Sequence, residues 1–173
     1  MPIMKIKKYG EEILTRKTKR VNFNTLEKQL PKIINDMTRS CIAMAGVGLA
    51  APQVGLDLAL AVLMIPVGEG EEKTYKRYVL INPEISAAKG TIPSDEGCLS
   101  FPGLDIQIER HKEVIVQYIN ENGLPVEMKA EGYLAIVLQH EIDHLNGILF
   151  IDHLKGAQRK EALEKIKELS KNW

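Results

Sequence analysis

Three parts of the chain have the apolar pattern expected of helices. In residues 26–44 apolar residues return every three or four positions, and Pro31 fits only a first turn, so we expect the main helix to begin there. A second stretch begins near Gly132 and stays apolar through Leu138. A third, residues 157–172, has apolar residues on one side and mostly Lys and Glu on the other. The pattern therefore predicts a helix early in the chain, a buried helix late in it and an amphipathic helix at its C-terminus.

Between the first two helices the chain has the pattern of β-strands. Apolar, alternating or β-branched runs occur at 58–65, 75–82, 104–108, 114–119 and 126–130. Pro83 closes the second run, a polar loop at 68–73 precedes it, and Asn122-Gly123 predicts a hairpin between the last two. We expect an α+β fold in which antiparallel or mixed β-sheets pack around the late helix, followed by the C-terminal helix.

The remaining segments have less regular patterns. Residues 3–21 place charged residues between isolated apolar ones, which predicts an extended arm lying against the domain and carrying no chemistry. Residues 46–55 are small, flexible and nearly uncharged, as in a loop where the backbone approaches a ligand, and Gln53 adds an amide that can donate and accept hydrogen bonds. The segment lacks the lysine of a phosphate-binding loop.

Length and composition narrow the possible functions. At 173 residues the chain suits a single domain, which we assign to residues 1–173. No apolar run is long enough to span a membrane. Equal numbers of basic and acidic residues, 23 each, give no field that would attract nucleic acid or an anionic membrane. We find no targeting segment and expect a cytoplasmic protein.

The late helix carries the strongest chemical motif of the sequence. His140 and His144 are four residues apart, so both imidazoles leave one face of a helix and can bind the same metal ion. Glu141 points about 100° away from His140 and is poorly placed as a ligand, but it can reach a water molecule beside the metal and act as a base. The pattern is typical of catalytic metal sites in hydrolases.

A catalytic metal usually has three protein ligands, so one further donor is expected. The position six residues past His144, where one peptidase class has a histidine, is Phe150. Another class takes a glutamate from a later helix, and a metallopeptidase of that kind is the alternative function here. The candidates in that helix, together with two other histidines, are Glu161, Glu164, Glu168, His111 and His153.

The two cysteines complete the set of possible ligands. Cys41 lies on the apolar stripe of the early helix, where a packing role is expected. Cys98 lies in a glycine-containing turn, and a thiolate is a strong ligand for a transition metal. We therefore predict Cys98 as the third ligand, brought to the histidines by tertiary folding.

Three segments together, Gly46 to Gln53, Glu96 to Ser100 and Gln139 to His144, resemble the signature motifs of the peptide deformylase family in order and spacing. The resemblance covers nearly the whole chain. It implies a hydrolase that removes the formyl group from N-formylmethionine of nascent polypeptides and releases formate. It also implies one metal ion per chain, usually Fe²⁺, with Zn²⁺, Ni²⁺ or Co²⁺ able to substitute.

The same resemblance implies a role for each matching residue. Cys98, His140 and His144 would bind the metal and Glu141 would be the general base, while Gln53 and the Leu99 N–H would hold the formyl oxygen. The expected substrate-binding residues are Val47, Gly48, Gly97, Ile136 and Val137.

Three further expectations come from the family's pattern. Glu96 and Arg110 have the order expected of an ion pair beneath the ligand loop. Asp105 departs from the pattern, because other members often carry a basic or aromatic residue there. The basic C-terminal helix invites the idea of a transient ribosome contact.

Overall fold

The computed structural model describes residues 3–26, 28–68 and 74–173, and residues 69–73 of the predicted polar loop lie outside this part. Its helices and strands follow the order expected from the sequence, with additional short elements. In chain order the α-helices and strands are α1 Phe23–Leu26, α2 Leu30–Ala43, β1 Gly48–Ala50, β2 Leu60–Val67, β3 Thr74–Lys89, β4 Ile92–Gly97, β5 Asp105–Arg110, β6 Glu113–Ile119, β7 Pro125–Glu131, α3 Gly132–Leu145 and α4 Gly156–Leu169. The short 3₁₀ helices are η1 Glu12–Thr15, η2 Ala51–Val54, η4 Phe150–His153 and η5 Ser170–Asn172.

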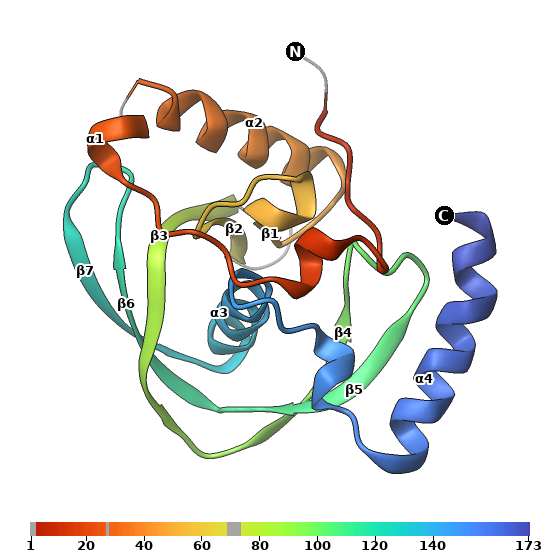
Figure 1. The fold of residues 1–173 in the computed structure, drawn as a ribbon. Coiled ribbons are helices and arrows are strands. Elements are labelled where there is room, and N and C mark those ends of the chain that lie inside the picture. Colours follow the sequence, from red (N-terminus) through yellow and green to blue (C-terminus); the bar gives the residue numbers. More distant parts are fainter. Residues whose placement is uncertain (1–2, 27, 69–73) are drawn as a thin grey trace.

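The strands form two antiparallel sheets around α3. One sheet has five strands in the order β1-β2-β3-β6-β7, and β4 and β5 form a separate pair. Figure 1 shows α3 in the middle of the molecule, with α2 above it and α4 along the outside near β5. The predicted α+β fold, with antiparallel sheets around a central helix and a helix at the C-terminus, is confirmed.

Helix α3 is apolar for most of its length, and these apolar residues are buried against the large sheet. Ala135, Leu138, Ile142 and Leu145 pack with Leu80 and other residues of the large sheet in one hydrophobic cluster. Removing this apolar surface from water is the main force that fixes the helix against the sheet. The motif residues near its C-terminal end are therefore attached to a rigid core element.

The first helical stretch is divided in two. Glu27 lies outside the described residues, α1 ends before it and α2 begins at Leu30, with Pro31 in its first turn as expected. Cys41 is fully buried in α2 among apolar residues, which confirms its packing position.

The predicted end of β3 at Pro83 is wrong, because the strand continues to Lys89. The pairing with β6 shifts in register between Ile81 and Glu84, and Asn82 has a positive φ of 51°. A bulge accommodates proline, which has no N–H to donate to a neighbouring strand.

Two other segments differ from expectation. Residues 48–54 were expected to be loop but form β1 and η2, with Leu49 and Ala50 fully buried. Strand β4 was not predicted, because its residues are mostly polar. It forms because β5 supplies its backbone partners along the full length of the strand.

Candidate metal centre

The C-terminal half of α3 brings the two motif histidines together. Their Nε2 atoms lie 3.2 Å apart, and both side chains are enclosed. Burial lowers the pKa of His144 well below its usual value, which favours the neutral imidazole that a metal needs. The helical spacing therefore produces the convergence expected from the sequence.

Cys98 follows the last residue of β4 and supplies the third donor. Its Sγ lies 3.3 Å from Nε2 of His144, and the donor atoms of Cys98, His140 and His144 all lie within 4.8 Å of one another. Donors bound to one tetrahedral ion are about 3.3–3.6 Å apart, so these separations fit a single metal ion. In the part of the chain that the structure describes, this is the one group of three or more His, Cys, Asp or Glu residues that converges in this way.

The other candidate ligands lie elsewhere. Glu161 and Glu168 of α4 form exposed ion pairs with Lys165 and Lys171. Glu164 of the same helix is exposed, and His111 Nδ1 lies 3.3 Å from the carbonyl oxygen of Gly90. These positions give no support to a peptidase that takes a glutamate ligand from the last helix.

A buried carboxylate orients His140. Glu96 Oε2 lies 2.8 Å from Nδ1 of His140, which leaves Nε2 directed at the metal position. Burial alone would raise the pKa of Glu96, but hydrogen bonds from Arg110 and His140 lower it to about 2. A carboxylate on the outer nitrogen of a ligating histidine fixes the orientation of its ring.

The expected pair of Glu96 and Arg110 is present beneath the ligand loop. Arg110 donates through Nε and Nη2 to the two Glu96 oxygens, at 2.8 and 3.0 Å, and both side chains are almost fully buried. Its Nη1 donates to Asp143, whose Oδ2 also lies 2.7 Å from His153 Nε2. His153 thus belongs to the support of the site and is not one of the three converging donors.

The pKa values of His140 and Glu141 are also shifted by their surroundings. Burial lowers the pKa of His140, but hydrogen bonds with Cys98 and Glu96 outweigh it and raise that pKa well above the usual value. A cation on Nε2 competes with the proton for the same nitrogen, so metal binding favours the neutral ring. Glu141 is 3 % exposed, and burial raises its pKa to about 7.

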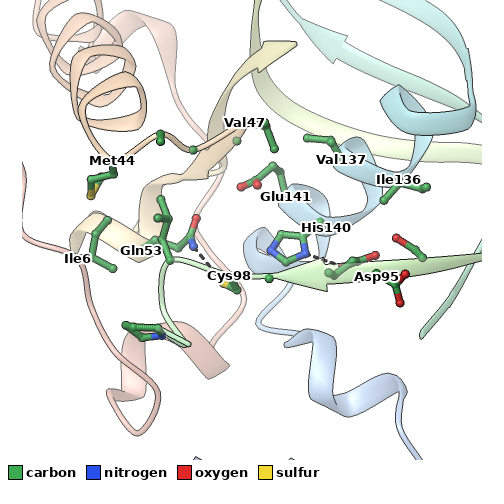
Figure 2. A pocket seen from close by; sticks show the side chains of 18 of the residues that line it. Ile6, Met44, Val47, Gln53, Asp95, Cys98, Ile136, Val137, His140 and Glu141 are labelled. Atoms are coloured by element: carbon green, nitrogen blue, oxygen red, sulfur yellow. Dashed lines mark hydrogen bonds and ion pairs between the residues drawn. The ribbon is translucent and has the colours of Figure 1, made fainter. Parts of the chain in front are cut away.

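Glu141 is the buried carboxylate best placed to act on a reactant. Its Oε2 has no hydrogen-bond partner among the described residues, although it is enclosed by protein. Figure 2 shows the carboxylate beside the His140 ring, between that ring and Val47. A buried oxygen of this kind is costly unless another group meets it, and a water or substrate in the cavity would do so.

The absence of a side chain at Gly48 makes room for the Glu141 carboxylate. A Cβ at residue 48 would overlap the Glu141 carboxylate, including its Oε1. A side chain at this position in β1 would displace the Glu141 carboxylate, which the sequence alone did not reveal.

Replacing Gly48 by Ala is expected to displace the Glu141 carboxylate. If Glu141 is the general base predicted from the sequence, kcat for hydrolysis should fall by about 10²-fold, because displacing a catalytic group by about 1 Å has effects of that size. Metal content should stay at the wild-type level, since neither Gly48 nor Glu141 is among the three converging donors. Steady-state kinetics and metal analysis of the purified variant would check this. An unchanged kcat would contradict Glu141 as the general base. Adding Glu141→Asp to the Gly48→Ala variant shortens the carboxylate side chain and should restore part of the lost rate.

The Gln53 side chain is held with its amino group toward the site. Its Oε1 accepts a hydrogen bond from the backbone N–H of Ala50 at 2.9 Å, so Nε2 faces the other way. Nε2 lies 3.5 Å from Cys98 Sγ and 3.3 Å from Ser100 Oγ, as Figure 2 shows for the cysteine. The amide therefore presents a donor next to the converging ligands.

One cavity of about 870 Å³ contains most of the residues expected at the site. The expected residues that line it are Val47, Gly48, Gln53, Gly97, Cys98, Leu99, Ile136, Val137, His140 and Glu141. Further lining residues that the sequence did not suggest are Ile6, Lys8, Met44, Pro102 and Tyr133. These belong to segments without a motif, and only the fold brings them to the cavity.

A model of the polypeptide deformylase family matches residues 3–160. The chain belongs to this family. A peptide deformylase from Elusimicrobium minutum is 49% identical over 175 residues, which cover 100% of this chain and 99% of that protein. Family membership identifies the chain as a metal-dependent hydrolase, and the family predicted from the three motifs is confirmed.

Solved deformylases share the fold closely. The crystal structure of a peptide deformylase from Legionella pneumophila has a TM-score of 0.86 and 39% identity, and the match covers 98% of this chain and 96% of that one. The deformylase of Ehrlichia chaffeensis in complex with actinonin has a TM-score of 0.86 and 36% identity, with coverage of 97% and 98%. No helix within the described ranges is long and apolar enough to cross a membrane.

Proposed function

We propose that the chain hydrolyses the N-formyl amide of formylmethionyl nascent peptides, using one metal ion held by Cys98, His140 and His144. The observation that carries this proposal is the convergence of three donor atoms beside the buried, unpartnered Glu141 oxygen. The bound ion would act as a Lewis acid and lower the pKa of the attacking water. The protein supplies the remaining chemistry.

Glu141 acts as general base and then as general acid. It accepts a proton from the water that attacks the formyl carbon, and it returns that proton to the amine nitrogen as the C–N bond breaks and formate leaves. The rise of its pKa to about 7 by burial suits both roles, because the carboxylate can gain and lose a proton near neutral pH.

Gln53 and Leu99 stabilise the charge that develops on the formyl oxygen. The Gln53 Nε2 is oriented toward the site by the Ala50 N–H, and the backbone N–H of Leu99 follows directly after Cys98 in the same wall of the cavity. Donors fixed before the reaction stabilise an oxyanion without reorganising, which is why such pairs contribute strongly to catalysis.

The cavity supplies specificity for an unbranched methionine side chain. Val47, Ile136 and Val137 provide apolar surface on the side of Glu141 and His140, as Figure 2 shows. Gly48 and Gly97 line the same cavity without side chains of their own. A flexible thioether fits such a surface by burying its methylene groups.

We further propose Fe²⁺ as the resident ion, with Zn²⁺, Ni²⁺ or Co²⁺ able to take its place. One thiolate and two imidazoles form a donor set that suits transition metals better than Mg²⁺ or Ca²⁺. Metal analysis of protein purified without oxygen would test this choice. Zinc as the dominant ion in such protein, with full activity, would contradict it.

Formate release tests the function itself. Metal-loaded protein should release formate from formyl-Met-Ala-Ser, and the acetylated peptide of the same sequence should serve as a poor substrate. Formate can be measured with a coupled dehydrogenase. Metal-replete protein that cleaves internal peptide bonds and releases no formate would overturn the proposal in favour of a metallopeptidase.

We also infer that residues 1–173 act as one catalytic domain in the cytoplasm, where formylated chains are made, and that α4 contacts the ribosome transiently. The support for the contact is the exposed lysines of α4, which include Lys160 and Lys167 and lie among exposed glutamates. Co-sedimentation with ribosomes should fall when both are replaced by Glu; unchanged co-sedimentation, or none by the wild type, would count against it.

A further inference from the structure

The N-terminal arm contacts both segments that carry the oxyanion donors. Three successive arm residues each donate a hydrogen bond to a backbone carbonyl of one of these segments. The bonds are Lys7 N to Gln53 O at 2.8 Å, Lys8 Nζ to Leu99 O at 2.9 Å and Tyr9 N to Ser100 O at 3.1 Å. The arm, which was expected from the sequence to carry no chemistry, therefore bridges the Gln53 segment and the Leu99 segment.

The arm is itself fixed on both sides of this bridge. Ile6 is buried with the core of α2, β1 and β2, and Figure 2 shows it beside Gln53. Tyr9 packs on Phe101 with ring centroids 5.0 Å apart. Glu11 accepts a hydrogen bond from the Lys8 backbone N–H at 3.0 Å and another from the Lys7 ammonium group. The segment that donates to the carbonyls of Gln53, Leu99 and Ser100 is therefore itself fixed in place.

Lys8 is the residue that makes its contact through a side chain. It lines the catalytic cavity, and no other Lys or Arg is among the described residues that do so. Its ammonium group lies next to the ligand loop, because Leu99 directly follows Cys98 in the chain.

We propose that Lys8 is a positioning residue for the hydrolysis, which holds the Leu99 backbone so that its N–H and the Gln53 amide point at the same oxygen. The Leu99 N–H lies in the peptide plane of the Cys98 carbonyl, which accepts a hydrogen bond from the Phe101 N–H at 2.8 Å, and the Leu99 carbonyl lies in the next plane. Holding both carbonyls limits rotation about φ and ψ of Leu99 and so limits how far its N–H can turn. A charged donor makes a stronger hydrogen bond than a neutral one. The inference rests on the proposed function, which assigns both donors to the formyl oxygen.

Three variants test this role. Lys8→Met keeps the length of the aliphatic stem and removes the donor, Lys8→Arg keeps a charged donor, and Lys5→Met removes an equal charge from an exposed position of the same arm. For each metal-loaded protein we would measure kcat and KM for formyl-Met-Ala-Ser, the metal content and the Tm.

We expect Lys8→Met to lower kcat about tenfold with KM changed by less than about twofold, because a misaligned donor weakens binding of the transition state and not of the substrate. Lys8→Arg should regain most of the rate, and Lys5→Met should match the wild type. Metal content should be unchanged in all three.

Other results would overturn the inference. A raised KM with unchanged kcat would mean that Lys8 binds substrate directly, and a fall in kcat matched by loss of metal or of folded protein would mean a structural role. If the wild type is active and Lys8→Met keeps its kcat, this inference alone fails. If metal-loaded wild type releases no formate, the proposed function fails and the inference falls with it.

Discussion

Replacing Glu141 by Gln is expected to lower kcat for formate release by about 10²- to 10⁴-fold, the range typical of removing a general base. Gln is close in size and shape to Glu, so the packing around a side chain that is 3 % exposed should survive. The amide cannot accept the proton of the attacking water. Metal content should stay at one ion per chain, because Glu141 is not among the three converging donors.

The measurement is the rate of formate release by metal-loaded Glu141→Gln beside the wild type, with metal content determined on the same samples. Glu164→Gln is the matched control: it makes the same chemical change at an exposed position of α4 and should leave the rate and the metal unchanged. Substantial activity in Glu141→Gln would rule out its role as base. Loss of metal in Glu164→Gln would instead revive the peptidase alternative.

Replacing Cys98 by Ala is expected to weaken metal binding by at least about 100-fold, because even loss of a residue that only supports a ligand costs 10–100-fold. The remaining donors are two histidines, too few to hold a catalytic metal firmly. Activity should fall with metal occupancy. The thiol of Cys98 is part-exposed in the cavity, so its removal should change the fold little.

The second cysteine provides the control. Cys41 is fully buried in α2, and burial raises the pKa of its thiol to about 12, so it carries no thiolate near neutral pH. Cys41→Ala should lower the Tm through lost packing and keep its metal. Metal content after dialysis against a chelator, measured for both variants, would separate the two roles. Equal retention by Cys98→Ala and the wild type would contradict Cys98 as a ligand.

The sequence predicted those helices and strands whose own residues show the apolar or β-branched pattern of the element. Helix α4 was expected because apolar residues recur on one side of it, and α3 because an apolar run leads into two histidines four residues apart. Strands β6 and β7 were expected because β-branched residues flank a turn sequence. Strand β4 was missed because its residues are mostly polar. It is held by pairing with β5 and by the contacts of buried Glu96 with Arg110 and His140.

The residues of the site also fall into two groups, those predicted from local sequence and those that only the structure revealed. His140, Glu141 and His144 were predicted from spacing, since a helix fixes their relative directions within two turns. Cys98 was predicted from the chemistry of thiolates and by resemblance. Sequence alone did not show that Gly48 makes room for Glu141, or that Asp143 and His153 join Arg110 beneath the ligands.

The sequence by itself therefore determined the family, the order of most helices and strands and the identity of the metal-binding motif. These depend on side-chain periodicity and on residues close together in the chain. Only the tertiary structure decided which face of Gln53 meets the ligands, which glycine gives space to the base and that the N-terminal arm holds the Leu99 carbonyl. Contacts between segments tens of residues apart follow from packing of the whole core, and no local pattern encodes them.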